Sequence, residues 1–231
     1  MKTLGMIGGI GPESTIAYYR SIIAAYREGR ADGDYPSIVI NSISVNKLLG
    51  LMSKNDHAAV ADWLVAEVER LARAGADFAL FASNTPHIVF DEVQLRCSIP
   101  LLSIVQATCQ AAQALGLKRV GLFGTGFTMQ ARFYPDVFAR QGIAVIMPAP
   151  DEQAFVHEKY MTELLNNVIR PETRERLLAI VRTMTDRDRI HGLILGGTEL
   201  PLILPDDGAA NIPFLDTTQI HARAAARRLL G

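Results

Sequence analysis

The stretch Thr3-Leu4-Gly5-Met6-Ile7-Gly8-Gly9-Ile10-Gly11-Pro12-Glu13-Ser14-Thr15 decides the fold. Its first part, Leu4–Ile7, is an apolar run with little polar alternation, which predicts a strand buried on both faces. The glycines that follow predict a tight turn, and Pro12 is typical of the first turn of a helix. A strand, a glycine turn and a helix in this order open a βαβ unit of a parallel sheet.

Further strands and helices alternate along the first half. Apolar runs at Ser37–Ile43, Phe78–Ala82 and Ile99–Ile104 predict three more strands. The helix expected over Ala58–Ala74 carries Val60, Leu64, Val68 and Leu71 on one face, with Asp62, Glu69 and Arg73 opposite. A second helix, over Glu13–Tyr26, is expected to bury Ile16, Tyr19 and Ile23.

The second half repeats this plan, so the chain is internally duplicated. Strands are expected at Val120–Phe123, Ala144–Met147, Gly192–Leu195 and Pro213–Leu215, and helices at Gln130–Arg140 and Thr173–Met184. Gly5–Gly9 aligns with Gly121–Thr125, and Ala82–Pro86 aligns with Gly196–Leu200. We expect an α/β fold of two similar lobes related by a pseudo-two-fold, each a parallel sheet with flanking helices.

The expected lobes are residues 1–105 with 216–231, and residues 106–215. Ligands of α/β folds bind at the carboxyl ends of parallel strands. Two duplicated lobes would bring such ends face to face, so we expect the ligand site in the cleft between them.

Composition excludes several classes of protein. The chain has 231 residues, 49% of them hydrophobic and 20% charged, and a formal net charge of -1. These values exclude intrinsic disorder and give no electrostatic drive toward nucleic acid or anionic lipid. The apolar runs are too short to span a membrane, and the start Met1–Gly8 does not resemble a signal peptide, so we expect a cytoplasmic protein. Cys97 and Cys109, the two cysteines, offer neither a disulfide framework nor a zinc site.

The glycine loop Gly8–Thr15 suits a small anion, because backbone amides and a helix amino terminus can point at it. It fails as a dinucleotide fingerprint, since Ser14 stands where the third glycine is required. A tight turn without any ligand is the alternative interpretation.

Four motifs resemble the cofactor-independent aspartate/glutamate racemases, and together they cover the whole chain. They are Gly8-Gly9-Ile10-Gly11-Pro12-Glu13-Ser14-Thr15, Asn84-Thr85-Pro86-His87, Gly124-Thr125-Gly126-Phe127-Thr128-Met129 and Gly197-Thr198-Glu199-Leu200. The resemblance implies a two-lobed α/β fold, a homodimer and racemisation by two cysteines, one removing the α-proton and the other returning a proton from the opposite face.

This chain departs from that pattern at both thiol positions, which hold Ser83 and Gly197. A serine hydroxyl is a weak base without an activating partner, and glycine has no side chain to carry a proton. Cys97 and Cys109 match neither position, and we expect them to be small buried residues. Natural divergence is the expected origin of the departure, with an engineered inactive variant as the alternative.

His87 and Glu199 are the remaining acid/base candidates. A solvent-facing His87 at a helix start and a structural Glu199 in a helix first turn are the competing interpretations. The expected substrate-binding residues are neutral donors on strand-end loops, with one lysine from His157-Glu158-Lys159-Tyr160, a segment that resembles one the family brings over its site. They are Gly9, Ser14, Thr15, Asn46, Asn84, Thr85, Thr125, Thr128, Thr198 and Lys159. Lys47 is a further candidate for pairing with a carboxylate, and a solvated surface position is the favoured alternative for both lysines.

No lysine stands in a motif for a pyridoxal Schiff base and no His/Asp/Glu spacing indicates a metal, so we expect no cofactor and no metal. The sequence therefore predicts a member of the racemase family that acts on or binds a small amino or dicarboxylic acid, with two-thiol racemisation impaired or absent. A non-catalytic ligand-binding homologue is the alternative.

Overall fold

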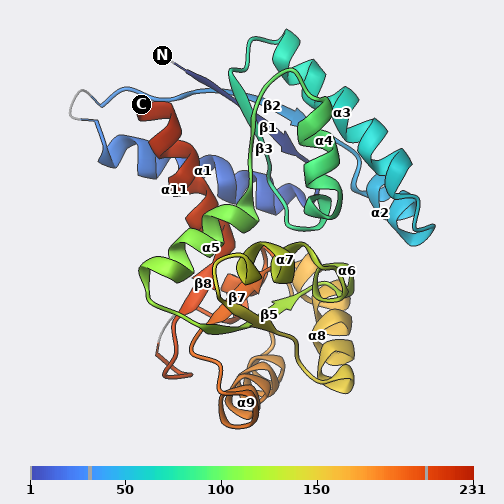
Figure 1. The fold of residues 1–231 in the computed structure, drawn as a ribbon, viewed down its shortest axis with the longest axis vertical. Coiled ribbons are helices and arrows are strands. Elements are labelled where there is room, and N and C mark those ends of the chain that lie inside the picture. Colours follow the sequence, from blue (N-terminus) through green and yellow to red (C-terminus); the bar gives the residue numbers. More distant parts are fainter. Residues whose placement is uncertain (1, 31–32, 206–207) are drawn as a thin grey trace. The chain divides into compact units, whose positions relative to one another are not determined.

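The computed structural model describes residues 2–30, 33–205 and 208–231 (Figure 1). The chain forms two compact units. The first contains Met1–Ile104 and Thr218–Gly231, and the second contains Val105–Thr217. Among the described helices, none combines the length and the apolar character needed to cross a membrane.

The first unit is built on a parallel sheet of four strands. These strands are β1 (Thr3–Gly8), β2 (Ser37–Ser42), β3 (Phe78–Phe81) and β4 (Leu101–Leu102), in the order β2-β1-β3-β4. β1 pairs with β2 from Thr3↔Ser37 to Gly8↔Ser42. All four residues of β3 are buried, as expected for a central strand covered on both faces.

Helices cover both faces of this sheet. Because β2 and β3 flank β1 on opposite sides, right-handed connections through α1 and α3 place these two helices on opposite faces (Figure 1). The helices of the unit are α1 (Pro12–Glu28), α2 (Val45–Ser53), α3 (His57–Arg73), η1 (Thr85–Val89), α4 (Phe90–Arg96) and α11 (Thr217–Leu230). The apolar face of α3 is buried as predicted, with Val60, Leu64, Val68 and Leu71 inside.

The second unit has the same topology. Its parallel strands are β5 (Arg119–Gly124), β6 (Ala144–Ile146), β7 (Leu193–Gly196) and β8 (Phe214–Asp216), in the order β6-β5-β7-β8. Its helices are α5 (Ile104–Ala114), α6 (Gly126–Gln130), α7 (Phe133–Ala139), α8 (Pro150–Thr162), η2 (Leu164–Asn166), α9 (Pro171–Asp188) and α10 (Leu200–Ile203). Two sheets with the same order of four strands confirm the predicted α/β fold class.

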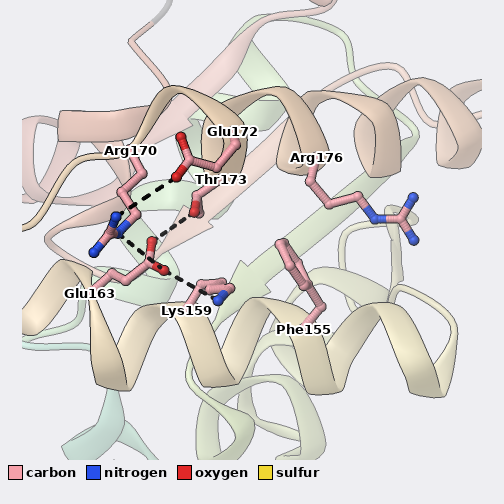
Figure 2. Close-up of a pocket in the computed structure, with 7 residues that line it drawn as sticks. All are labelled: Phe155, Lys159, Glu163, Arg170, Glu172, Thr173 and Arg176. Carbon is pink, nitrogen blue, oxygen red and sulfur yellow. Dashed lines mark hydrogen bonds and ion pairs between the residues drawn. The ribbon is translucent and has the colours of Figure 1, made fainter.

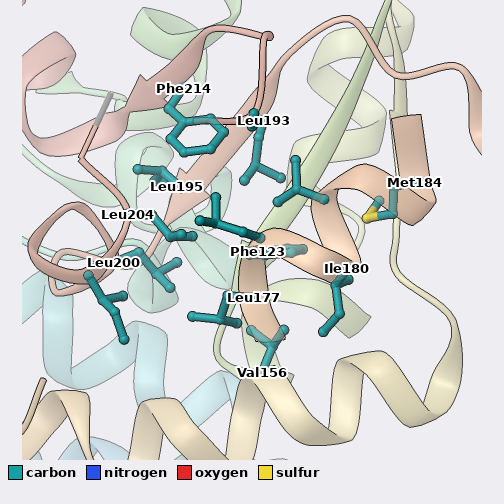
Figure 3. Close-up of a cluster of buried hydrophobic side chains, with 14 of the residues drawn as sticks. Phe123, Val156, Leu177, Ile180, Met184, Leu193, Leu195, Leu200, Leu204 and Phe214 are labelled. Carbon is teal, nitrogen blue, oxygen red and sulfur yellow. The ribbon is translucent and has the colours of Figure 1, made fainter. Parts of the chain in front are cut away.

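Packing in the second unit joins strands and helices into one apolar core. Phe123 of β5 and Leu195 of β7 contribute to the cluster from the sheet, Val156 from α8 and Leu177 from α9 (Figure 3). Each of these four side chains has at most 1% of its surface exposed. Burying one such side chain contributes about 1.5–3 kcal/mol to folding, so this core fixes α8 and α9 relative to the strands of their own unit.

The structure corrects the face that α1 buries. Its buried residues are Ser14, Tyr18, Ile22 and Tyr26, whereas Ile16 and Tyr19 are 45% and 44% exposed and Ile23 is half-buried. A hydrogen bond explains which face is buried: the Tyr18 hydroxyl lies 3.0 Å from Nδ1 of His221 on α11 and bonds to it. A helix rotated to bury Ile16 would lose this buried hydrogen bond.

Two element boundaries also differ from the prediction. The helix expected over Gln130–Arg140 is two helices, α6 and α7, separated by the extended residue Ala131. In one continuous helix the ring of Pro135 would clash with the carbonyl of Ala131, four residues earlier. The strand expected over Ile99–Ile104 shrinks to β4, because Pro100 has no amide hydrogen to donate and α5 begins at Ile104.

Candidate functional site: the strand-end loops of each unit

The glycine loop after β1 is closed by its own polar groups. Gly9 has a φ of +79°, a conformation that favours glycine, and a Cβ there would collide with the backbone of Ile43. The Gly9 amide donates to Oγ1 of Thr15 over 2.8 Å, and that hydroxyl lies 3.3 Å from the carbonyl oxygen of Gly11. Ser14 is buried and Thr15 is half-buried. The contacts of the Thr15 hydroxyl with Gly9 and Gly11 hold the loop in its own conformation.

The loop after β3 carries Ser83, Asn84 and Thr85 and is anchored by His87. Asn84 and His87 are each 3% exposed, while Ser83 and Thr85 are half-buried. The amide of Ile104 donates to Nε2 of His87 over 3.2 Å, so the ring proton lies on Nδ1, which donates to the carbonyl oxygen of Asn84, also over 3.2 Å. No described residue hydrogen-bonds to the Ser83 hydroxyl.

His87 is thus buried rather than solvent-facing, which corrects one of its two expected interpretations. Its ring stacks on Phe90 with centroids 5.0 Å apart. Burial, assisted by nearby His221, lowers the pKa of His87 to about 3. Burial also lowers the pKa of His221 to about 4, and Nε2 of that ring donates to the Leu102 carbonyl oxygen. Both imidazoles are neutral near pH 7 and tie the loop after β3 to its own unit.

In the second unit, the loop after β5 begins α6 and meets α8. Oγ1 of Thr125 accepts from the Thr128 amide over 3.3 Å and lies 3.2 Å from the Thr128 hydroxyl, which caps the helix. The Gly126 amide donates to Nδ1 of His157 over 3.0 Å. This bond anchors α8 beside the loop.

The loop after β7 has an aromatic ring where Gly197 lacks a side chain. A Cβ built on Gly197 would lie 2.9 Å from both Cζ and the hydroxyl oxygen of Tyr160, and would collide with the ring edge. Tyr160 comes from α8 and is 5% exposed. The place that a side chain at position 197 would occupy is therefore filled by this tyrosine.

Glu199 follows in the same loop and is 5% exposed. Its Oε2 accepts a short hydrogen bond from the Tyr160 hydroxyl and a 2.8 Å hydrogen bond from Oγ1 of Thr198. Glu199 is the residue immediately before α10, where a negative charge is favourable. Burial and the negative charge of Glu199 raise the pKa of the Tyr160 phenol well above its usual value.

The structure thus brings together Thr125, Thr128, Gly197, Thr198 and Glu199 within the second unit, and adds two residues that the sequence analysis did not single out. His157 and Tyr160 stand three residues apart on one face of α8. The segment His157–Tyr160 was noticed for its lysine. The i, i+3 spacing of these two polar aromatic side chains is the signal from which their shared face could have been found.

Lys159 points elsewhere, which removes it from this group. Its ammonium forms 3.2 Å ion pairs with Glu158 and Glu163, which hold the pKa of Lys159 above its usual value. It lines a cavity of about 370 Å³ between α8 and α9 (Figure 2). There Glu163 also accepts from Thr173 over 2.7 Å, so this carboxylate joins Lys159 and Thr173 in the cavity wall. The remaining residues lining it are Phe155, Arg170, Glu172 and Arg176.

Two further candidates lie at the start of α2. Asn46 is exposed in the first turn of that helix. The Lys47 ammonium lies 4.6 Å from the centre of the Trp63 ring on α3, a cation–π contact that accounts for its position.

The cysteines offer no thiolate at neutral pH. Burial raises the pKa of Cys97 to about 11, with the charge of Glu69 assisting, and burial also raises the pKa of Cys109. Cys109 is buried as expected, whereas Cys97 is half-buried. Within the described ranges, no three His, Cys, Asp or Glu side chains gather as metal ligands.

Comparisons with known proteins agree with one another. The sequence model of the Asp/Glu/Hydantoin racemase family matches residues 7–225. The broad specificity amino-acid racemase RacX of Bacillus subtilis is 25% identical over 232 residues, which span 98% of each chain. A solved structure of a proposed Asp/Glu racemase from Yersinia pestis is 32% identical, covers 100% of both chains and has a TM-score of 0.92. An aspartate racemase homologue from Pyrococcus horikoshii, also 32% identical with full coverage of both chains, has a TM-score of 0.86.

Proposed function

The chain belongs to the Asp/Glu/hydantoin racemase family, and we propose that it acts on or binds a small amino or dicarboxylic acid without a cofactor, with two-thiol racemisation impaired or absent. The resemblance read from the four motifs is confirmed by the family match. The observation that carries the proposal is the state of the two loops after β3 and β7. Both keep polar groups suited to a carboxylate, yet position 83 is serine and position 197 is glycine.

The ligand class is argued from the neutral donors of these loops. Asn84 and Thr85 follow β3 at the carboxyl end of the strand, where parallel sheets bind ligands, whereas the Thr198 hydroxyl after β7 already donates to Glu199. A carboxylate accepts hydrogen bonds from amides and hydroxyls, and an aspartate or glutamate carries two such groups. The activity named for the relative from Bacillus subtilis, broad-specificity amino-acid racemisation, supports amino acids as the class to test first.

Calorimetric titration tests this proposal. The L- and D-forms of aspartate, glutamate, alanine and arginine are the probes, together with succinate. We expect heat with at least one of them, and at least a ten-fold weaker affinity in Thr85→Val. Thr183→Val is the matched control, because its hydroxyl is exposed on α9 and donates only to its own helix. Absence of binding for every probe would overturn the proposal.

Binding without catalysis is the second candidate function. The observation that favours it is the missing side chain at Gly197, since glycine carries no acid or base. α-Proton exchange in deuterated water separates the two, because a binding protein leaves the proton in place whereas one surviving base removes it.

We also propose a homodimer, which rests on the family resemblance. Light scattering at micromolar concentration is expected to give twice the mass of one chain, 25.2 kDa. A mass of one chain would remove this part of the proposal.

A further inference from the structure

We propose that the Tyr160 hydroxyl, backed by Glu199, is the acid/base group of the second unit and takes the place of the side chain that Gly197 lacks. The inference rests on the proposed function, since it names the group that exchanges the α-proton of the bound amino acid. It assigns a role to a tyrosine that the sequence placed only at the end of the segment around Lys159.

The first support is placement. A Cβ on Gly197 would collide with the Tyr160 ring edge and lie 2.9 Å from the Tyr160 hydroxyl oxygen, so the phenol occupies the space where a side chain at position 197 would begin. Tyr160 is held there by two contacts of its helix: α8 packs in the apolar core through Val156, and His157 accepts from the Gly126 amide over 3.0 Å. The hydroxyl is thus fixed by packing, as an acid/base group must be.

The second support is a proton acceptor already in contact. The Tyr160 hydroxyl donates to Oε2 of Glu199, and Thr198 donates to the same oxygen over 2.8 Å. Two donors on one oxygen are the pattern of an ionised carboxylate. The buried phenol beside this negative charge resists ionisation, so a free tyrosinate is not the base.

A relay avoids the tyrosinate. As the Cα–H bond of the substrate breaks, its proton moves to the Tyr160 oxygen while the phenolic proton moves to Oε2 of Glu199. The electron pair of the broken bond stays on the substrate as a carbanion conjugated with its carboxyl group. Nothing is oxidised or reduced, and the reverse transfer after solvent exchange delivers a deuteron to the same face.

The relay works from one face only. Inversion requires a second acid/base group on the opposite face of the substrate, and the pair formed by Tyr160 and Glu199 does not supply one. Exchange of the α-proton with retention is therefore expected to outpace racemisation, for one enantiomer of the substrate.

The test is α-proton exchange in deuterated water, followed by NMR on the probe that gives heat in calorimetry. Tyr160→Phe keeps the ring that fills the space at Gly197 and removes the hydroxyl, so we expect exchange to fall at least 100-fold with the dissociation constant within three-fold. Tyr134→Phe is the matched control: Tyr134 is equally buried in the same unit, hydrogen-bonds to Thr108 and Thr217, and its loss is expected to leave exchange unchanged.

Glu199→Gln is the second variant, and it tests the same proposal if Tyr160→Phe does not fold. It keeps the size of the side chain and an oxygen for the phenol, but removes the proton acceptor, so exchange is expected to fall while binding persists. Wild-type rates in Tyr160→Phe, or binding by the unmodified chain without any exchange, would overturn the inference and leave the proposed binding function standing. No binding at all would overturn both.

Discussion

The loops after β3 and β7 occupy equivalent places in two units of the same topology, yet they are held by opposite chemistry. The loop after β3 is anchored by His87, a neutral ring whose two nitrogens bond to backbone groups. The loop after β7 is anchored by Tyr160 and Glu199, a phenol bonded to a carboxylate. The first anchor can only hold its loop, whereas the second can also exchange a proton.

Helix length explains why only one unit has the tyrosine. The first helix after the second strand is α2 in the first unit, with 9 residues, and α8 in the second, with 13 residues. Tyr160 stands in the last turn of α8, beyond the length that α2 reaches. The duplication thus keeps the sheet and varies the helix that closes the site, and glycine at 197 accommodates the ring that the longer helix brings.

Lowering the pH is expected to have the largest effect on the free energy of unfolding, and it acts on the two buried histidines of the first unit. His87 and His221 have pKa values of about 3 and about 4 in the folded protein, below the ordinary value of 6.5. The unfolded chain therefore binds more protons below pH 6.5, and stability is lost as pH falls from there toward 4. We expect the free energy of unfolding to fall by about 2 kcal/mol for each histidine between pH 7.5 and pH 5.

Urea unfolding at the two pH values measures this loss. His87→Gln keeps polar groups but does not titrate, and is expected to remove about half of the pH dependence, as is His221→Gln. An unchanged slope in either variant would show that the neutral histidines are not what the first unit depends on.

Gly197→Cys is expected to lower the free energy of unfolding by about 3 kcal/mol, because the new Cβ overlaps the Tyr160 ring. Ser83→Cys, the equivalent change in the first unit, is a nearly isosteric exchange and is expected to cost less than about 1 kcal/mol. Adding Tyr160→Leu to Gly197→Cys should recover part of the loss through relief of the overlap. If Gly197→Cys unfolded at the same urea concentration as the unmodified chain, the Tyr160 ring would not be what fills the space at position 197.

Restoring a two-thiol site therefore takes three changes rather than two. Ser83→Cys and Gly197→Cys place the sulfurs, and Tyr160→Leu makes room for the second. Racemisation by the triple variant above that of the double variant is the outcome expected from the geometry.

Tyr160→Phe is expected to destabilise by about 2 kcal/mol, since the buried Glu199 carboxylate loses its shortest donor. Tyr134→Phe should cost about 1 kcal/mol, because its lost partners are neutral hydroxyls. Chemical denaturation of the two variants compares them directly. Equal losses would mean that the carboxylate adds nothing to the second anchor.

Lys159→Ala is expected to have the smallest effect. Its ammonium pairs with Glu158 and Glu163 beside water, where ion pairs contribute little. Calorimetric heat and affinity should match those of the unmodified chain, because the lysine lies in the cavity between α8 and α9. A ten-fold loss of affinity would return Lys159 to the binding residues.

The sequence was sufficient for the sheets and for part of the helix faces. Eight apolar runs predicted eight parallel strands, since strands buried on both faces leave a continuous apolar signal. The face of α3 was correct because its period is carried by aliphatic residues. The face of α1 was wrong because Tyr18 is buried by a hydrogen bond to His221, 203 positions away, which periodicity does not contain.

The candidate residues that follow a strand could be located from the sequence, whereas Tyr160, which we propose as a further one, comes from a helix. Thr125, Thr198 and Glu199 follow β5 and β7, so the rule of strand carboxyl ends finds them. Tyr160 reaches Gly197 only through the packing of α8, a tertiary contact across 37 positions. The glycine at position 197 is the one sign in the sequence from which a residue filling that space could have been expected.

Chiral chromatography of aspartate and glutamate incubated with the unmodified chain tests the central claim most directly. Positions 83 and 197 carry no thiol, and the Tyr160 ring fills the space beside Gly197. We therefore predict that neither enantiomer is converted above the rate in buffer, while the α-proton of a bound amino acid exchanges. Rapid interconversion of L- and D-aspartate or of L- and D-glutamate by the unmodified chain would contradict it.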